Sequence, residues 1–132
     1  MRVFVTGASG WIGSAVVDEL LTAGHEVTGL ARSDASAAAL EAKGARVRRG
    51  DLDDLDGIRL GAQDAEAVIH LANKHDFANM AAMNAAERAV VQTIGDALAG
   101  TGRPFLLASG FAALGQGRPT TEDDPSPFHG PD

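Results

Sequence analysis

Short apolar runs alternate with segments of helical periodicity along the whole chain. The apolar runs predict five buried strands, over residues 2–6, 25–31, 46–50, 67–72 and 104–109. Between them, apolar residues recur every three or four positions, which indicates helices. The expected helices cover residues 11–23, from 33 or 34 to about 43, from 53 or 54 to about 61, and 77–98.

Glycines and capping residues mark the helix ends. Gly24 follows the first helix, where a left-handed conformation costs glycine least. Ser33 or Asp34 can cap the second helix, and Asp53 or Asp54 the third. Five apolar residues of the longest helix fall on one face and are expected to face the core: Met80, Met83, Val90, Ile94 and Leu98.

Strands that alternate with helices predict an α/β fold with a parallel sheet covered on both faces. A reversal of direction after the third strand gives the doubly wound strand order 3-2-1-4-5. In that order the ligand crevice lies at the carboxyl ends of the first and fourth strands. The arginines of residues 46–50 suit an edge strand, because charge discourages pairing between sheets. We expect one domain over residues 1–132, with residues 110–132 largely loop.

Composition narrows the classes of function. The chain has 132 residues, of which 45% are hydrophobic and 22% charged, as is ordinary for a soluble globular protein. No apolar run has the length of a membrane span or a signal peptide, which favours a cytoplasmic protein. A net charge of −7 argues against a nucleic-acid surface. The chain has no cysteine and its histidines lack ligand spacing, so no metal site is expected.

The segment TGASGWIG carries three glycines, each three residues from the next, between the first strand and the first helix. The first glycine allows a tight turn, the second a close approach of a pyrophosphate, and the third a close contact between helix and sheet. Free N–H groups at the helix start would then meet the phosphates. The alternative is a glycine-rich turn without a ligand. The candidate cofactor contacts here are Gly7, Ser9, Gly10, Trp11, Ile12 and Gly13.

This T-G-x-x-G-x-x-G spacing resembles that of extended and atypical short-chain dehydrogenases/reductases, the NAD-dependent epimerase/dehydratase-like proteins. The segments GLARSD, RRGDLDD, VIHLAN, AAMNAAERAV and GRPTTEDDP follow in the family's order, so the resemblance covers the whole chain. It implies the N-terminal portion of a Rossmann-type enzyme, with a sheet that is incomplete relative to the family. The implied activity is an oxidoreductase or epimerase-like reaction on a small molecule, without nucleic acid or membrane, and a homo-oligomer stays open.

The end of the second strand bears on the choice of cofactor. An acidic residue there would bind a ribose 2′-hydroxyl and repel a 2′-phosphate. The chain instead has Arg32, a planar donor for phosphate, followed by the hydroxyl of Ser33. Asp34 argues against a phosphate site, but it lies one or two positions after the place of the acidic residue that would bind the ribose. The alternative to a phosphate-binding Arg32 is a solvated loop arginine. The segment favours NADP(H) over NAD(H).

Two further strand ends provide candidate cofactor contacts. The family places a carboxylate against the adenine after the third strand, which points to Asp51 with Leu52; the alternative for Asp51 is a cap of the next helix. The residues that end the fourth strand are expected to border the cofactor's ribose, and they are Leu71, Ala72 and Asn73. We interpret His70 as a packed strand residue rather than a catalyst.

The family's acid/base is a tyrosine assisted by a lysine four residues later, and this chain contains no tyrosine. Its two lysines, Lys43 and Lys74, are not placed for that role. Ser109 is the candidate for the family's catalytic serine, although aligning residues 114–115 with the family's Tyr-Gly pair would place Gly110 there. Asn84 matches the asparagine that holds a proton-relay water, and a solvent-facing asparagine is its alternative.

Three hypotheses follow. The leading one is a fragment of an NADP(H)-dependent oxidoreductase that acts on a carbonyl, hydroxyl or sugar-like substrate, without its substrate domain and inactive by itself. The second is a non-catalytic module that binds NADP(H) or senses redox state. The third is a scaffold that binds partners and no nucleotide.

Overall fold

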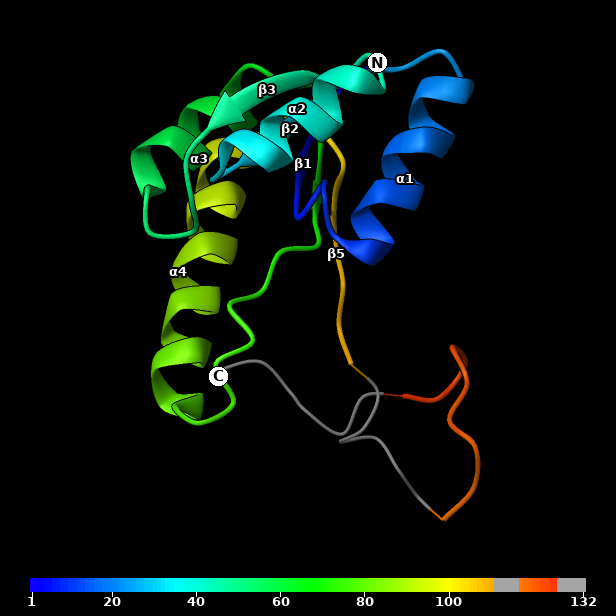
Figure 1. The fold of residues 1–132 in the computed structure, drawn as a ribbon. Coiled ribbons are helices and arrows are strands. Elements are labelled where there is room, and N and C mark those ends of the chain that lie inside the picture. The colour runs from blue at the N-terminus through cyan, green and yellow to red at the C-terminus, as the bar shows by residue number, and fades with distance from the viewer. Residues whose placement is uncertain (111–116, 126–132) are drawn as a thin grey trace.

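The computed structural model describes residues 1–110 and 117–125, and the structural statements below refer to these residues (Figure 1). Strands and helices alternate throughout. None of the helices in this part of the chain combines the length and apolarity of a membrane span. The elements are β1 Arg2–Thr6, α1 Trp11–Thr22, β2 Glu26–Ala31, α2 Asp34–Ala42, β3 Arg46–Arg49, α3 Leu55–Gln63, β4 Ala67–His70, α4 Met80–Leu98 and β5 Phe105–Leu107.

The strands form one parallel sheet in the order β3-β2-β1-β4-β5, which confirms the predicted doubly wound α/β topology. β1 lies at the centre, where Phe4 has Thr28 on one side and Val68 on the other. β3 is an edge strand, as its arginines predict. The carboxyl ends of β1 and β4 therefore lie side by side, and the chain leaves them in opposite directions across the sheet.

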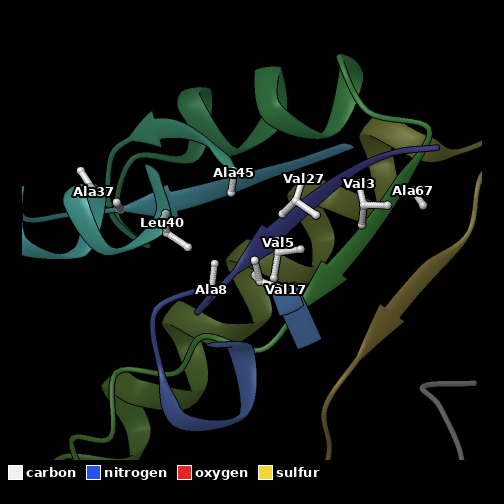
Figure 2. Close-up of a cluster of buried hydrophobic side chains, with 10 residues drawn as sticks. Val3, Val5, Ala8, Val17, Val27, Ala37, Leu40, Ala45 and Ala67 are labelled. Carbon is white, nitrogen blue, oxygen red and sulfur yellow. The ribbon is translucent and has the colours of Figure 1, made fainter. Parts of the chain in front are cut away.

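Two apolar cores lie on opposite faces of the sheet. Successive residues of a strand point to opposite faces, so Val3 and Val5 enter one core and Phe4 the other. α1 and α2 cover the first core, to which they contribute Val17 and Leu40 (Figure 2). α3 and α4 cover the second core, and their buried residues there are Ile58, Ala62, Val90, Ile94 and Leu98. Burial on both faces explains why β1 is a continuous apolar run rather than an alternating one.

Two boundaries differ from the predicted ones in an informative way. β4 ends at His70 instead of at residue 72. β1 turns away from the sheet at Gly7, whose φ is 68°, so the N–H of Ala72 binds the hydroxyl of Thr6 instead of extending the ladder. α4 begins at Met80 rather than at residue 77, and Met80 is exposed instead of joining the core. The other element ends agree with the prediction within two residues.

Side-chain caps fix the starts of three helices. The Ser33 hydroxyl accepts the N–H of Ser36 at the start of α2, at 3.1 Å. A carboxylate oxygen of Asp54 accepts the N–H of Gly57 at the start of α3, at 3.0 Å. α4 is capped in the same way by Asn79, whose position explains the late start of that helix. Of the alternatives in the sequence, Ser33 rather than Asp34 and Asp54 rather than Asp53 are therefore the caps.

The second core supplies a test of this packing. Replacing the fully buried Ile94 with alanine should lower the free energy of unfolding by about 2–5 kcal/mol, because the cavity adds to the lost transfer energy. The change is to be measured by urea denaturation. The same truncation at the exposed Leu60 of α3 is the control and should cost within about 0.5 kcal/mol. Equal losses at both positions would contradict the packing described here.

Candidate functional site

The first glycine of the TGASGWIG loop, Gly7, forms the turn at the end of β1. Its φ of 68° lies in the left-handed region that favours glycine. The chain after β4 packs directly against it, because a Cβ at Gly7 would lie 2.7 Å from the nitrogen of Ala72 and 2.8 Å from the carbonyl carbon of Leu71. A side chain at Gly7 would therefore force apart the carboxyl end of β1 and the segment that follows β4.

The other two glycines of the loop differ sharply in their surroundings. A Cβ at Gly13 would lie 1.8 Å from the carbonyl oxygen of Gly7, so α1 can lie on the end of β1 only with glycine there. A Cβ at Gly10 would meet the same oxygen at 3.2 Å, and no other described atom outside its chain neighbours lies within 4 Å. Gly10 has extended backbone angles, with φ −73° and ψ 176°. The fold itself therefore makes a weaker demand for glycine at Gly10 than at Gly13.

The N-terminus of α1 differs from the other helix starts in lacking a side-chain cap. The first bond within the helix runs from the N–H of Ser14 to the carbonyl oxygen of Gly10, at 2.8 Å. The N–H groups of Trp11, Ile12 and Gly13 precede it and have no partner within the helix. Trp11, Ile12 and Ser9 are exposed around these groups, with Trp11 96% exposed. Unpartnered N–H groups and the positive end of the helix dipole together suit an anion.

At the end of β2, the guanidinium of Arg32 is exposed and makes no hydrogen bond or ion pair with any described residue. Asp34 is the acidic residue whose position in the sequence argues against a phosphate site. Its carboxylate binds Nη1 of Arg49 at 2.7 Å. The Ser33 hydroxyl caps α2 and donates to Oγ of Ser36 at 2.9 Å. In this structure it therefore stabilises the helix start, whether or not it also contacts a phosphate. Arg32 is thus the free cation at this strand end within the described part of the chain.

Arg49 is a residue of this region that the sequence analysis did not identify. Residue 49 pairs with Ala31 in the register of β2 and β3, so its side chain starts beside the segment that carries Arg32. The run of arginines in β3 indicates an edge strand but does not show which of them lies next to β2's end. Only the strand register supplies that information.

The loop after β3 is organised by Asp51. One of its carboxylate oxygens accepts the N–H of Asp53 at 2.8 Å and that of Asp54 at 3.2 Å. Asp54 caps α3, so the alternative role of Asp51 as that cap is excluded. Leu52 packs partly buried against the second core. Asp53 binds Nζ of Lys74 at 2.6 Å, which ties this loop to the one that follows β4.

The end of β4 is held by polar bonds beneath it. His70 is 1% exposed, with Nδ1 2.6 Å from the Thr6 hydroxyl and Nε2 3.0 Å from a carboxylate oxygen of Glu87. Its burial agrees with a packed strand residue. Leu71 and Ala72 are partly exposed above it, and Asn73 is exposed, with its side-chain oxygen accepting the N–H of His75 at 2.8 Å.

The two candidate catalytic residues lie on different elements. Ser109 is exposed beyond the carboxyl end of β5, and Asn84 is exposed in the second turn of α4. No hydrogen bond joins them in the described residues. Residues 114–115, used to align the family's Tyr-Gly pair, lie outside the described residues. Lys43 is committed elsewhere, since its ammonium binds Asp18 at 2.7 Å and the hydroxyl of Ser14 at 2.7 Å.

A hollow of about 490 Å³ runs along the outer face of α1 and is lined by Trp11, Ile12, Ala15, Val16, Glu19 and Leu20. This lining is almost entirely apolar and is unsuited to a pyrophosphate.

In the GRPTTEDDP stretch, Arg118 binds Asp124 and holds the pKa of that carboxyl below its usual range, with help from the Thr121 N–H. Over residues 1–110 and 117–125, no group of three acidic or histidine side chains could hold a metal ion.

Relatives with similar sequences are longer than this chain. An uncharacterised protein of Saccharomyces cerevisiae is 43% identical over 126 residues, which are 94% of this chain and 42% of that protein. An uncharacterised protein of Schizosaccharomyces pombe is 46% identical over 114 residues, 86% of this chain and 39% of that protein. The chain thus spans about two fifths of the length of these relatives.

Similarity to solved structures and to a family of sequences agrees with the fold. The yeast methylglyoxal/isovaleraldehyde reductase, solved in complex with NADPH, superposes with a TM-score of 0.68 and 28% identity, over 86% of this chain and 38% of the reductase. The sequence model of the NAD dependent epimerase/dehydratase family matches residues 3–131. The glycine loop at the end of β1 and the strand order are what such a dinucleotide-binding sheet requires. The chain belongs to the NAD-dependent epimerase/dehydratase family.

Proposed function

We propose that this chain is the NADP(H)-binding part of an oxidoreductase of the short-chain dehydrogenase/reductase superfamily, which acts on a carbonyl, hydroxyl or sugar-like small molecule. The observation that carries the proposal is the uncapped start of α1 behind the glycine turn. Gly7 and Gly13 are required by the fold itself, whereas an open Gly10 serves the approach of a ligand. Family membership supports the same nucleotide site.

The preference for NADP(H) over NAD(H) rests on charge at the end of β2. Arg32 has no counter-ion among the described residues, while the nearby Asp34 is engaged by Arg49. A 2′-phosphate would give Arg32 a planar, charge-assisted partner. Arg49, on the neighbouring strand, neutralises the Asp34 carboxylate and so leaves Arg32 as the net positive charge at this strand end among the described residues. The similar yeast reductase binds NADPH, which supports this choice.

The remaining contacts follow from the strand ends. Asp51 has one carboxylate oxygen that is not used in its loop, and this oxygen is available for the adenine amino group, with Leu52 beside it. The partly exposed Leu71, Ala72 and Asn73 would border the ribose that carries the nicotinamide. When bound, the cofactor supplies or accepts a hydride. In this chain, the backbone around Gly10 would hold the pyrophosphate and fix the cofactor's depth in the crevice.

A non-catalytic NADP(H)-binding or redox-sensing module is the second candidate, and a specific observation favours it. The chain has no tyrosine, and both of its lysines are bound to carboxylates, Lys43 to Asp18 and Lys74 to Asp53. In the first candidate, Ser109 and Asn84 would assist an acid/base that belongs to another part of the full-length protein.

Gly10→Val should abolish measurable NADPH binding while the fold survives. Valine suits the extended backbone at this position, but its side chain would occupy the space through which a pyrophosphate approaches. Calorimetric titration gives the affinity and thermal unfolding the stability. Gly95→Val, on the open side of α4, is the matched control and should bind as the wild type does. Equal affinities in all three proteins would remove the phosphate site.

Arg32→Glu should shift the preference from NADPH towards NADH. Loss of the contact between guanidinium and phosphate should cost about 1.5–3 kcal/mol, or roughly tenfold or more in NADPH affinity. The ratio of the NADPH and NADH dissociation constants is the quantity to measure. Arg88→Glu makes the same change of charge on the exposed part of α4 and should leave this ratio unchanged. A constant ratio in Arg32→Glu would make Arg32 a solvated surface residue.

The 132-residue chain by itself should show no reductase turnover even with NADPH bound. Positioned acid/base catalysis contributes about 10²–10⁴-fold, and the chain has no tyrosine to provide it. The assay follows NADPH absorbance with aldehydes, ketones and quinones, in the wild type and in a Lys74→Ala, His75→Ala double variant. Turnover lost in the double variant would assign catalysis to the loop after β4. Turnover that persists would point to Ser109 and Asn84.

A further inference from the structure

A chain of hydrogen bonds crosses the interior just beneath the nucleotide crevice. It begins at Glu87 on α4, passes through His70 on β4, and reaches Thr6 at the end of β1. Thr6 and His70 are the buried polar side chains of the described residues, and every other side chain in the two cores is apolar. Glu87 is 30% exposed, so the chain of bonds ends near the surface of the second core.

The bonds of Thr6 fix where each hydrogen lies. A threonine hydroxyl has one hydrogen to donate and two lone pairs that accept. Its oxygen accepts the N–H of Ala72 at 3.2 Å and shares the N–H of Leu71, which lies 3.2 Å from both this hydroxyl and the Thr6 carbonyl oxygen. The hydroxyl hydrogen must then point to Nδ1 of His70, 2.6 Å away. A hydrogen on Nδ1 would instead leave the hydroxyl hydrogen of Thr6 without a partner among the described residues.

His70 is therefore an acceptor at Nδ1 and a donor at Nε2. The Nε2 hydrogen is directed to the carboxylate of Glu87 at 3.0 Å, which selects this neutral tautomer. Every buried polar atom of these three side chains then has a partner, in line with the absence of unsatisfied buried side-chain atoms in the described residues. A carboxylate on α4 thereby determines which hydrogen bond is made at the end of β1.

The far end of this chain of bonds reaches the wall of the glycine turn. The two N–H groups held by Thr6 belong to Leu71 and Ala72, whose backbone atoms lie where a Cβ on Gly7 would be. A small movement of this segment changes the space at the turn and at the ribose border. An interaction made by α4 can thus set the shape of the chain at the end of β4.

We infer that Glu87, His70 and Thr6 are positioning residues that hold the end of β4 in the shape that binds the cofactor. The inference rests on the proposed function, because it names which interior contacts set the affinity of that same site. None of the three side chains acts as an acid or base in it. The interior bonds act on the cofactor only through the backbone of Leu71 and Ala72.

The first experiment needs no substitution. In wild-type protein labelled with ¹⁵N, NMR should show His70 with its hydrogen on Nε2 and with an unprotonated Nδ1. A hydrogen on Nδ1 would overturn the inference, since the Thr6 hydroxyl could then not be oriented as described.

The second experiment uses two matched pairs of variants. Thr6→Val removes the hydroxyl and Thr6→Ser keeps it; Glu87→Leu removes the acceptor and Glu87→Gln keeps one. We expect the valine and leucine variants to bind NADPH roughly tenfold more weakly, as for the loss of one buried hydrogen bond, and the serine and glutamine variants to bind within about twofold of wild type. Amide hydrogen exchange at Leu71 and Ala72, relative to Val68, should accelerate only in the first two.

Ile94→Val controls for general loss of stability, because it weakens the same core without touching these bonds. It should leave the exchange of Leu71 and Ala72 relative to Val68 unchanged. Equal exchange and equal affinity in all variants would overturn the inference. If the wild type binds no NADPH, the proposed function fails, and the tautomer and the exchange rates still decide whether Glu87 and His70 order the end of β4.

Discussion

The contact between Gly13 and the carbonyl oxygen of Gly7 is the constraint on which the rest of the structure depends. Because no side chain separates them, α1 lies directly on the end of β1, and Val17, one turn later, enters the first core fully buried. The same contact aims the unpartnered N–H groups of the first turn at the crevice. Packing of the core and orientation of the site are therefore one geometric requirement, met by glycine at a single position.

The interior is divided between apolar packing and one polar path. Most of the sheet is held by aliphatic side chains that pack against helices on both faces. Thr6 and His70 interrupt this pattern where β1 and β4 reach the crevice. Buried polar groups are costly unless each has a partner, so they also specify the geometry of the groups that satisfy them. The polar path lies where β1 and β4 end and the chain turns out of the sheet, and the apolar packing fills the rest of the interior.

The proposed anion site of this acidic protein depends on local arrangement rather than on net charge. The chain carries a net charge of −7, yet the start of α1 offers N–H groups without a side-chain cap, and Arg32 has no counter-ion among the described residues. Three nearby carboxylates have partners: Asp34 binds Arg49, Asp53 binds Lys74, and Asp54 caps α3. These pairings reduce the repulsion that a phosphate would otherwise meet at the crevice.

The sequence by itself determined the elements, their order and the glycine loop, because each of these follows from local pattern. Apolar runs identified the strands, capping residues limited the helix starts, and the alternation of elements predicted the sheet order. Tertiary structure decided the choices that depend on residues far apart in the chain. Ser33 and Asp54 are the caps because the folded backbone brings their side-chain oxygens to the N–H groups of Ser36 and Gly57. The strand register places Arg49 beside the end of β2, and the packing of α4 brings Glu87 to His70. Neither contact can be predicted from the positions of these residues along the sequence.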